Sequence, residues 1–247
     1  MRGEDHPVTM DAMESLGNTY SMQGRLTEGK ELVEKSLVMK RKLFGDRHNS
    51  TLNTMINLGQ SYHNLGMLCE AVELQQKTPN LILETLGSDH PYTLRAMMWL
   101  GNSYGSQGRY DESMNLHKAA LAASARVLGD QHPNTLDIIV NLAVSYYRQR
   151  QFNDALQLLE PAVMELKAKR GERNPRTLQA QNLLDVIQQE LQNPAPQSEV
   201  NQTSNLTHDA TVQQSQNDPK ETLVDALSLH TEPNTEFIAG CTKSRAC

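Results

Sequence analysis

The chain has 247 residues, a formal net charge of −6 at pH 7, 38% apolar residues and only 4% aromatic residues. The acidic balance and the absence of a Lys/Arg stripe argue against nucleic acid as a partner. No apolar run is long enough to span a membrane, and the first residues are charged, so we predict a cytoplasmic protein without a signal peptide or a membrane partner.

A repeat of 42 residues organises most of the chain. Both glycine and threonine recur at this spacing, as Gly3, Gly45, Gly87, Gly129 and Gly171 and as Thr9, Thr51, Thr93, Thr135 and Thr177. Such self-similarity is typical of stacked repeat architectures. The array is predicted to occupy residues 1–192, with four full units followed by a capping half-unit, at about residues 3–44, 45–86, 87–128, 129–170 and 171–192.

Each unit is expected to form two helices in succession. In the first helix, apolar residues recur at offsets of three, four and seven, as in Met13, Leu16 and Tyr20, which places them on one face. A small residue next to that leucine, such as Gly17, should let the partner helix approach. The second helices are expected to end at the repeated glycines and to begin near Thr27, Cys69, Asp111 and Asn153, of which all but Cys69 are good N-caps.

Two sequence features bear on where these helices break and where they begin. Pro79 falls inside the second helix of the second unit and should break or kink it. A histidine precedes each of the first four first helices. Zinc ligands lie about 2.0–2.1 Å from one ion, whereas stacked helices are about 8–10 Å apart, so these histidines cannot share a metal. Three of them precede a proline, and we assign all four to the start of a helix: His6, His48, His90 and His132.

The first helices reproduce the core of the tetratricopeptide repeat (TPR) pattern, W-x2-L-G-x2-Y, with Met or Ile in place of Trp. The stretch "LGSDHPYTLRAMMWLGNSYGSQGRYDESMNLHKAALAASARVLGDQHPNTL" resembles the 42-residue repeats of kinesin light chains. It is equally similar to the arrays of fungal NACHT or NB-ARC nucleotide-binding proteins. The resemblance implies an all-α, right-handed superhelix, an α-solenoid of helix-turn-helix repeats. It also implies a concave groove, lined by the first helices, that binds a peptide or a partner protein.

Candidate groove residues follow from the same resemblance. In the family, an asparagine just before the leucine of the first helix bonds the backbone of a bound peptide, and Asn57 and Asn141 occupy that position here. Amides three residues further on lie near the same face and offer donors and an acceptor. Two arginines would add charge recognition, and the tryptophan is either a platform or part of the packing. The predicted groove residues are Asn18, Asn57, Gln60, Arg95, Trp99, Asn102, Asn141 and Arg148.

These patterns favour a non-catalytic protein–protein interaction scaffold with no cofactor, metal or catalytic residue. An alternative is a truncated regulatory relative of a nucleotide-binding TPR sensor, which would act by repeat–repeat association with another TPR protein. A nucleotide-dependent enzyme is disfavoured. The segment "GRLTEGKE" matches seven positions of a phosphate-binding loop, but no strand precedes it, and the repeat explains Gly24 as a turn and Gly29 as a packing position.

Residues 193–247 lose the repeat and are rich in Gln, Asn, Ser, Thr and Pro. Such a composition buries too little apolar surface to offset the entropy of ordering, so we predict a disordered tail. Within it, "KETLVDALSLH" at residues 220–230 is amphipathic and is expected to form at most a transient helix, unless a partner or the groove binds it.

Overall fold

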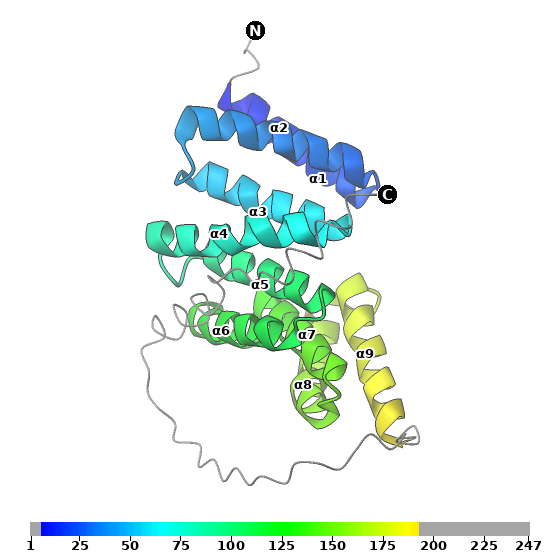
Figure 1. Ribbon diagram of the computed structural model, residues 1–247. Coiled ribbons are helices and arrows are strands. Elements are labelled where there is room, and N and C mark those ends of the chain that lie inside the picture. The colour runs from blue at the N-terminus through cyan, green and yellow to red at the C-terminus, as the bar shows by residue number, and fades with distance from the viewer. Residues whose placement is uncertain (1–5, 193–247) are drawn as a thin grey trace.

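The computed structural model describes residues 6–192, which form nine α-helices and no strand (Figure 1). The predicted tail lies outside the described residues. No helix within 6–192 combines the length and the apolar character needed to cross a membrane. In chain order the helices are α1 (Pro7–Met22), α2 (Leu26–Phe44), α3 (Asn49–Asn64), α4 (Leu68–Leu86), α5 (Pro91–Ser106), α6 (Tyr110–Leu128), α7 (Pro133–Arg148), α8 (Phe152–Arg170) and α9 (Pro175–Gln192).

The helices stack in sequence order, each packing on the next, as Figure 1 shows. The odd-numbered first helices also contact one another, α1 with α3, α3 with α5, α5 with α7 and α7 with α9. The first helices therefore form one layer, and the second helices α2, α4, α6 and α8 pack against it. The predicted all-α solenoid of helix pairs is confirmed.

Small residues set the distance between paired helices. A Cβ added at Gly101 on α5 would lie 2.6 Å from Nε2 of His117 on α6. Real side chains do not come so close, so only glycine fits while His117 holds its position. The interpretation of this position as a packing site is therefore confirmed.

The four histidines begin the first helices, as predicted. Each is an N-cap whose Nδ1 accepts a hydrogen bond from the backbone N–H two residues later, at 3.1 or 3.2 Å. This satisfies one of the donors that the first turn leaves unpaired. At α9 the side chain of Asn174 takes the same part, accepting from the N–H of Arg176 at 2.9 Å.

The predicted starts of the second helices are wrong by two residues. The N-cap of α2 is Arg25, not Thr27, and its side chain makes no capping hydrogen bond; α4, α6 and α8 begin in the same way. The turn closes when the N–H of Arg25 donates to the carbonyl of Tyr20 at 2.9 Å, so Arg25 becomes the N-cap and the helix starts at Leu26. The guanidinium of Arg25 instead lies 3.8 Å from the centre of the Tyr20 ring and pairs with Glu28.

The second helices end at the repeated glycines. At Gly45, Gly87, Gly129 and Gly171, φ lies between 80° and 88° and ψ between 158° and 173°. This region is essentially restricted to glycine, since a Cβ would clash with the backbone. The predicted end at a glycine is confirmed, and the glycine backbone is more extended than the left-handed conformation usual at helix C-termini.

Of the break or kink predicted at Pro79, the break does not occur. Helix α4 runs without interruption from Leu68 to Leu86 with Pro79 inside it. Pro79 is buried, and Val72 and Ile82 on either side of it are 7% and 0% exposed. Pro79 therefore lies in the buried stripe of α4, and the helix continues through it despite the missing backbone donor.

Candidate functional site

A buried lysine anchors a polar network at the N-terminal end of the first-helix layer. Lys40 on α2 is 1% exposed, and its Nζ lies 2.7 Å from Glu14 Oε2 and 2.9 Å from Asp11 Oδ1. Nζ also donates to Thr54 Oγ1 at 3.0 Å. Burial works against the charge of the lysine, but the hydrogen bonds to the two carboxylates outweigh it, so the pKa of Lys40 is raised.

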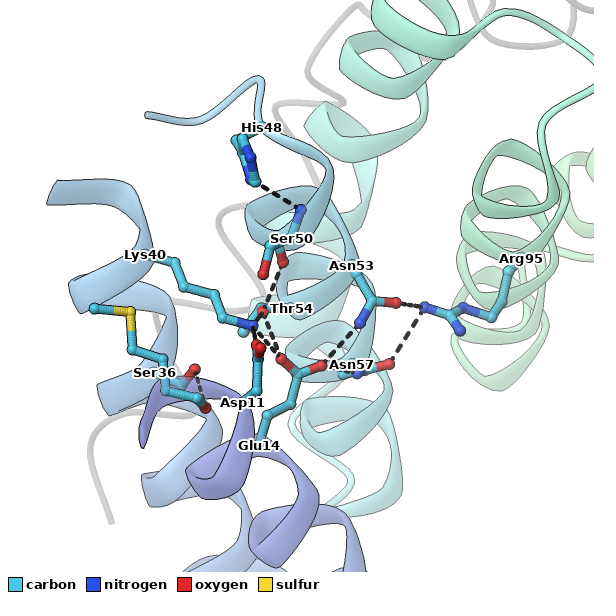
Figure 2. Close-up of polar contacts among 11 residues, drawn as sticks. Asp11, Glu14, Ser36, Lys40, His48, Ser50, Asn53, Thr54, Asn57 and Arg95 are labelled. Atoms are coloured by element: carbon cyan, nitrogen blue, oxygen red, sulfur yellow. Dashed lines mark hydrogen bonds and ion pairs between the residues drawn. The ribbon is translucent and has the colours of Figure 1, made fainter. Parts of the chain in front are cut away.

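Two amides connect this carboxylate to an arginine two units along, as Figure 2 shows. On α3, the Nδ2 groups of Asn53 (at 3.0 Å) and Asn57 donate to Glu14 Oε1. Their Oδ1 atoms face the guanidinium of Arg95 on α5, which donates to both. Each amide thus directs its NH2 group at the anion and its oxygen at the cation, which polarises the chain of hydrogen bonds from Lys40 to Arg95.

Arg95 is the least satisfied member of this network. Its Nε is buried and has no hydrogen-bond partner among the described residues, and the guanidinium carbon lies 5.2 Å from the centre of the Tyr92 ring. Burial lowers the pKa of Arg95, although an arginine remains charged in proteins. The side chain therefore keeps capacity for a further acceptor.

A pocket of about 180 Å³ opens beside Arg95, between α5 and α7, with the end of α6 as its third wall. Its apolar lining includes Leu94, Met98 and Ile138, and Asp137 adds a carboxylate. Helices α5 and α7 touch less extensively than α3 and α5 do. The pocket thus lies at a looser contact within the first-helix layer, and the remaining lining residues are Pro91, Tyr92, Ser124, Leu128 and Asn134.

A second polar network joins the last helices. Asp137 on α7 accepts two hydrogen bonds from Arg170 on α8, at 2.9 and 3.0 Å, and one from Nε of Arg176 on α9, at 3.1 Å. Arg176 also donates to the Oδ1 of Asn141 at 2.5 Å. Burial lowers the pKa of Arg176, while the nearby Asp137 partly opposes this shift.

A buried histidine lies behind the middle of the layer. His117 on α6 is 1% exposed, and its Nε2 lies 3.1 Å from Oδ1 of Asn102 and 3.3 Å from the carbonyl of Met98. Burial lowers the pKa of His117 to about 4, so the ring is neutral at pH 7 and has a single N–H group to donate. The buried His117 ring therefore holds the side-chain oxygen of Asn102 in place.

The segment resembling a phosphate loop forms no such loop. Gly24 sits in the turn between α1 and α2, and Lys30 lies within α2, where its Nζ is 3.5 Å from Glu34 Oε2. No group of three or more His, Cys, Asp or Glu side chains within residues 6–192 could hold a metal ion.

Comparison with known proteins establishes the family. The family model of the tetratricopeptide repeat matches residues 8–78 and 92–163, which is more than half of the chain. The chain is a tetratricopeptide repeat protein. TPR repeats generally mediate protein–protein interactions, and TPR proteins are generally non-catalytic scaffolds. No curated protein matches the sequence.

Solved structures place this TPR protein near kinesin light chain repeats. A crystal structure of nearly identical TPR-like repeats, described as a kinesin light chain of Podosopora anserina, has 28% sequence identity and a TM-score of 0.64, and the match covers 76% of this chain and 90% of that one. For a variant of the same repeats, the sequence identity is 26% and the TM-score is 0.65, and the match covers 78% of this chain and 91% of that one. BtubC (BKLC) from P. vanneervenii shares the fold, with 15% sequence identity and a TM-score of 0.59. That match covers 83% of this chain and 88% of that one. The kinesin light chain resemblance is confirmed, and the link to nucleotide-binding sensors stays a prediction.

The predicted groove residues of this TPR protein all lie on first helices, but they meet different neighbours. Asn57 and Arg95 belong to one network, Asn141 bonds Arg176, and Asn102 bonds His117. Trp99 is half-buried, packs against the hydrophobic core around α3 and lies 5.7 Å edge-on from the ring of His63. The remaining three are solvent-accessible, with Asn18 and Arg148 exposed and Gln60 half-buried. Their part in ligand binding stays a prediction.

Several residues that build the two networks were not identified from the sequence. Lys40 and Glu14 replace residues that are mostly apolar at equivalent positions of the other units, such as Ile82 and Ile56. A charged residue at a position that other repeats bury needs a partner that offsets the cost of burying the charge. The sequence alone could therefore have indicated the pairing of Lys40 and Glu14. A second signal is the polar series at one repeat position of the first helices: Asp11, Asn53, Arg95, Asp137 and Gln179.

Proposed function

We propose that this protein is a non-catalytic scaffold that binds a peptide or protein segment along its first-helix layer. The observation that carries the proposal is the pocket between α5 and α7. Apolar residues line it, and Arg95 adds a buried Nε without a partner among the described residues. Such a combination of apolar surface and a few directed polar groups is typical of binding sites.

The neighbouring amides support binding of an extended backbone. Asn57 is half-buried, and its Nδ2 carries two N–H groups, of which Glu14 takes one. Asn141 likewise bonds Arg176 through its oxygen, which leaves its NH2 group for a ligand carbonyl. The scaffold would therefore hold one side chain of the ligand in the pocket and contact its main chain through these amides.

The test selects peptides from a random peptide library on the full chain and measures their affinity by calorimetry. Asn134 lines the pocket and is exposed, so Asn134→Trp fills the pocket without removing packed atoms. We expect at least a tenfold loss of affinity with this variant, and about a fivefold loss with Asn57→Ala, equivalent to ~1 kcal/mol for one hydrogen bond.

Asn115 on α6 is an exposed asparagine of the other layer, so Asn115→Trp is the matched control and should bind as the wild type does. Circular dichroism of every variant separates loss of binding from loss of fold. If the selected peptides bind Asn134→Trp and Asn57→Ala with the affinity of the wild type, the first-helix layer is not the ligand site.

A further inference from the structure

A buried histidine holds one amide of the first-helix layer from behind. His117 on α6 is 1% exposed, and its Nε2 is within hydrogen-bond distance of two oxygens of α5, the side-chain Oδ1 of Asn102 and the carbonyl of Met98. Asn102 is half-buried, and its Nδ2 makes no hydrogen bond within residues 6–192 and stays accessible to solvent. One side of this amide therefore meets the protein interior, and the other side is open.

The carbonyl of Met98 decides which way the amide points. A carbonyl oxygen only accepts hydrogen bonds, so Nε2 carries the single proton of the neutral His117 ring. The same N–H faces the side chain of Asn102, so the atom that it meets there is the oxygen. The other ring nitrogen, Nδ1, lies 3.5 Å from Oγ of Ser113, a hydroxyl that is able to donate to it. The NH2 group of Asn102 is thus turned outward.

The other units lack this arrangement. The residues equivalent to His117 are Val33, Gln75 and Leu159, and those equivalent to Asn102 on the same units are Asn18, Gln60 and Val144. Gln75 is buried, and neither its Nε2 nor its Oε1 has a hydrogen-bond partner among the described residues, so it does not hold Gln60. Of these four pairs, that of the third unit is the one in which a second helix directs an amide of the first.

Asn102 lies on the same side of α5 as the pocket. It follows Arg95 by seven residues and Met98 by four, and both of these line the pocket. Residues four and seven apart share one face of a helix. Seven residues rise by roughly 10 Å along the helix axis. An extended chain covers this distance with about three residues, at ~3.3 Å each.

We propose that Asn102 donates a hydrogen bond to a main-chain carbonyl of the bound segment, about three residues from the side chain in the pocket. His117 is the positioning residue that keeps the NH2 group of Asn102 turned toward the ligand. The inference rests on the proposed scaffold function and adds a contact that this function does not require. It also sets a rule for the ligand: a proline is accepted at this point, because proline lacks the backbone N–H but keeps the carbonyl.

The orientation of the amide is tested without a ligand, by the nitrogen NMR spectrum of the His117 ring in the full chain at pH 7. The loss of signals in His117→Gln identifies the two ring nitrogens. We expect the proton on Nε2 and none on Nδ1. A proton on Nδ1 would leave Nε2 as an acceptor, turn the NH2 group of Asn102 inward and overturn the proposal.

The ligand contact is tested with library-selected peptides whose affinity for the full chain falls at least tenfold with Asn134→Trp. Asn102→Asp puts an oxygen in place of the NH2 group, while the N–H of His117 still has an oxygen to bond. We expect a loss of about tenfold or more, because two acceptors then face each other, and about fivefold with Asn102→Ala. Asn115→Asp on α6 is the matched control; it makes the same charge change at an exposed asparagine of the other layer and should bind as the wild type does.

The positioning role is tested at His117 itself. His117→Leu copies Leu159, which is 0% exposed, and should weaken binding about two- to threefold, because a free amide presents its NH2 group only part of the time. His117→Gln keeps an N–H donor and should restore the wild-type affinity. In the Asn102→Ala background, His117→Leu should cause no further loss, whereas a purely structural role of the ring would weaken binding in both backgrounds. Circular dichroism checks that each variant is folded.

The outcomes separate this inference from the scaffold function. Peptides that Asn134→Trp weakens, but that bind Asn102→Asp and Asn102→Ala as they bind the wild type, would overturn the proposal and leave the scaffold function standing. An equal loss from His117→Leu with and without Asn102 would overturn the positioning role. If Asn134→Trp weakens none of the selected peptides, the scaffold function fails, and this inference fails with it.

Discussion

Replacing Lys40 by leucine should destabilise the N-terminal part of the array, because it leaves the buried Glu14 carboxylate without its cation. Glu14 is 6% exposed, and Nζ of Lys40 lies 2.7 Å from its Oε2. Removing one member of a buried ion pair typically costs ~3–5 kcal/mol. Thr54, Asn53 and Asn57 still donate to Glu14. We therefore expect the free energy of unfolding to fall by an amount near the lower end of this range, ~3 kcal/mol.

A double variant separates the loss of the ion pair from the loss of packing. Val140 and Leu166 occupy the equivalent positions in the fourth unit, and both are 0% exposed. Glu14→Val combined with Lys40→Leu therefore copies an apolar pair that this fold already accommodates. Exchange of a buried ion pair for well-packed apolar residues is often neutral or stabilising, so the double variant should recover most of the ~3 kcal/mol.

The assay is amide hydrogen exchange resolved to α1, α2 and α3, because repeat arrays can unfold in parts and one global midpoint would hide a local change. Lys35→Leu on α2 is the matched control; Lys35 is exposed, so we expect a change within ~0.5 kcal/mol. A loss below ~1 kcal/mol for Lys40→Leu would refute the argument that Glu14 depends on this cation.

The remaining predictions concern a buried histidine and a strained turn. His117 has a folded-state pKa of about 4, below its ordinary 6.5, so the unfolded chain takes up a proton first and stability falls as the pH drops from about 6.5 to 4, by up to ~3 kcal/mol. His117→Gln copies Gln75 of the second unit and should remove this part of the pH dependence, measured by urea unfolding at pH 7 and pH 4.5. If the pH dependence of stability stays the same in this variant, His117 is not a buried neutral ring. Arg150 has a φ of 59° at a position where Gly24, Gly66 and Gly108 stand in other units, so Arg150→Gly should stabilise by ~1 kcal/mol. A lower melting temperature would contradict that estimate.

Much of the fold could be predicted because helix periodicity is local. The 42-residue spacing predicted the helix pairs, and Gly17 was correctly interpreted as a position where the partner helix approaches. Two local features were nevertheless misjudged. The second helices begin two residues earlier than expected, and α4 continues through Pro79. In both cases tertiary packing and the closure of the preceding turn outweigh the preference of the individual residue.

For the candidate site, the sequence by itself determined that polar residues of the first helices share one layer, because their spacing repeats. Only the tertiary structure decided which of them meet. Glu14 contacts Lys40, 26 residues away, and Asn57, 43 residues away. These contacts depend on how far each helix pair is rotated and shifted against the next, which local periodicity does not specify. The pocket beside Arg95 follows from the same stacking geometry.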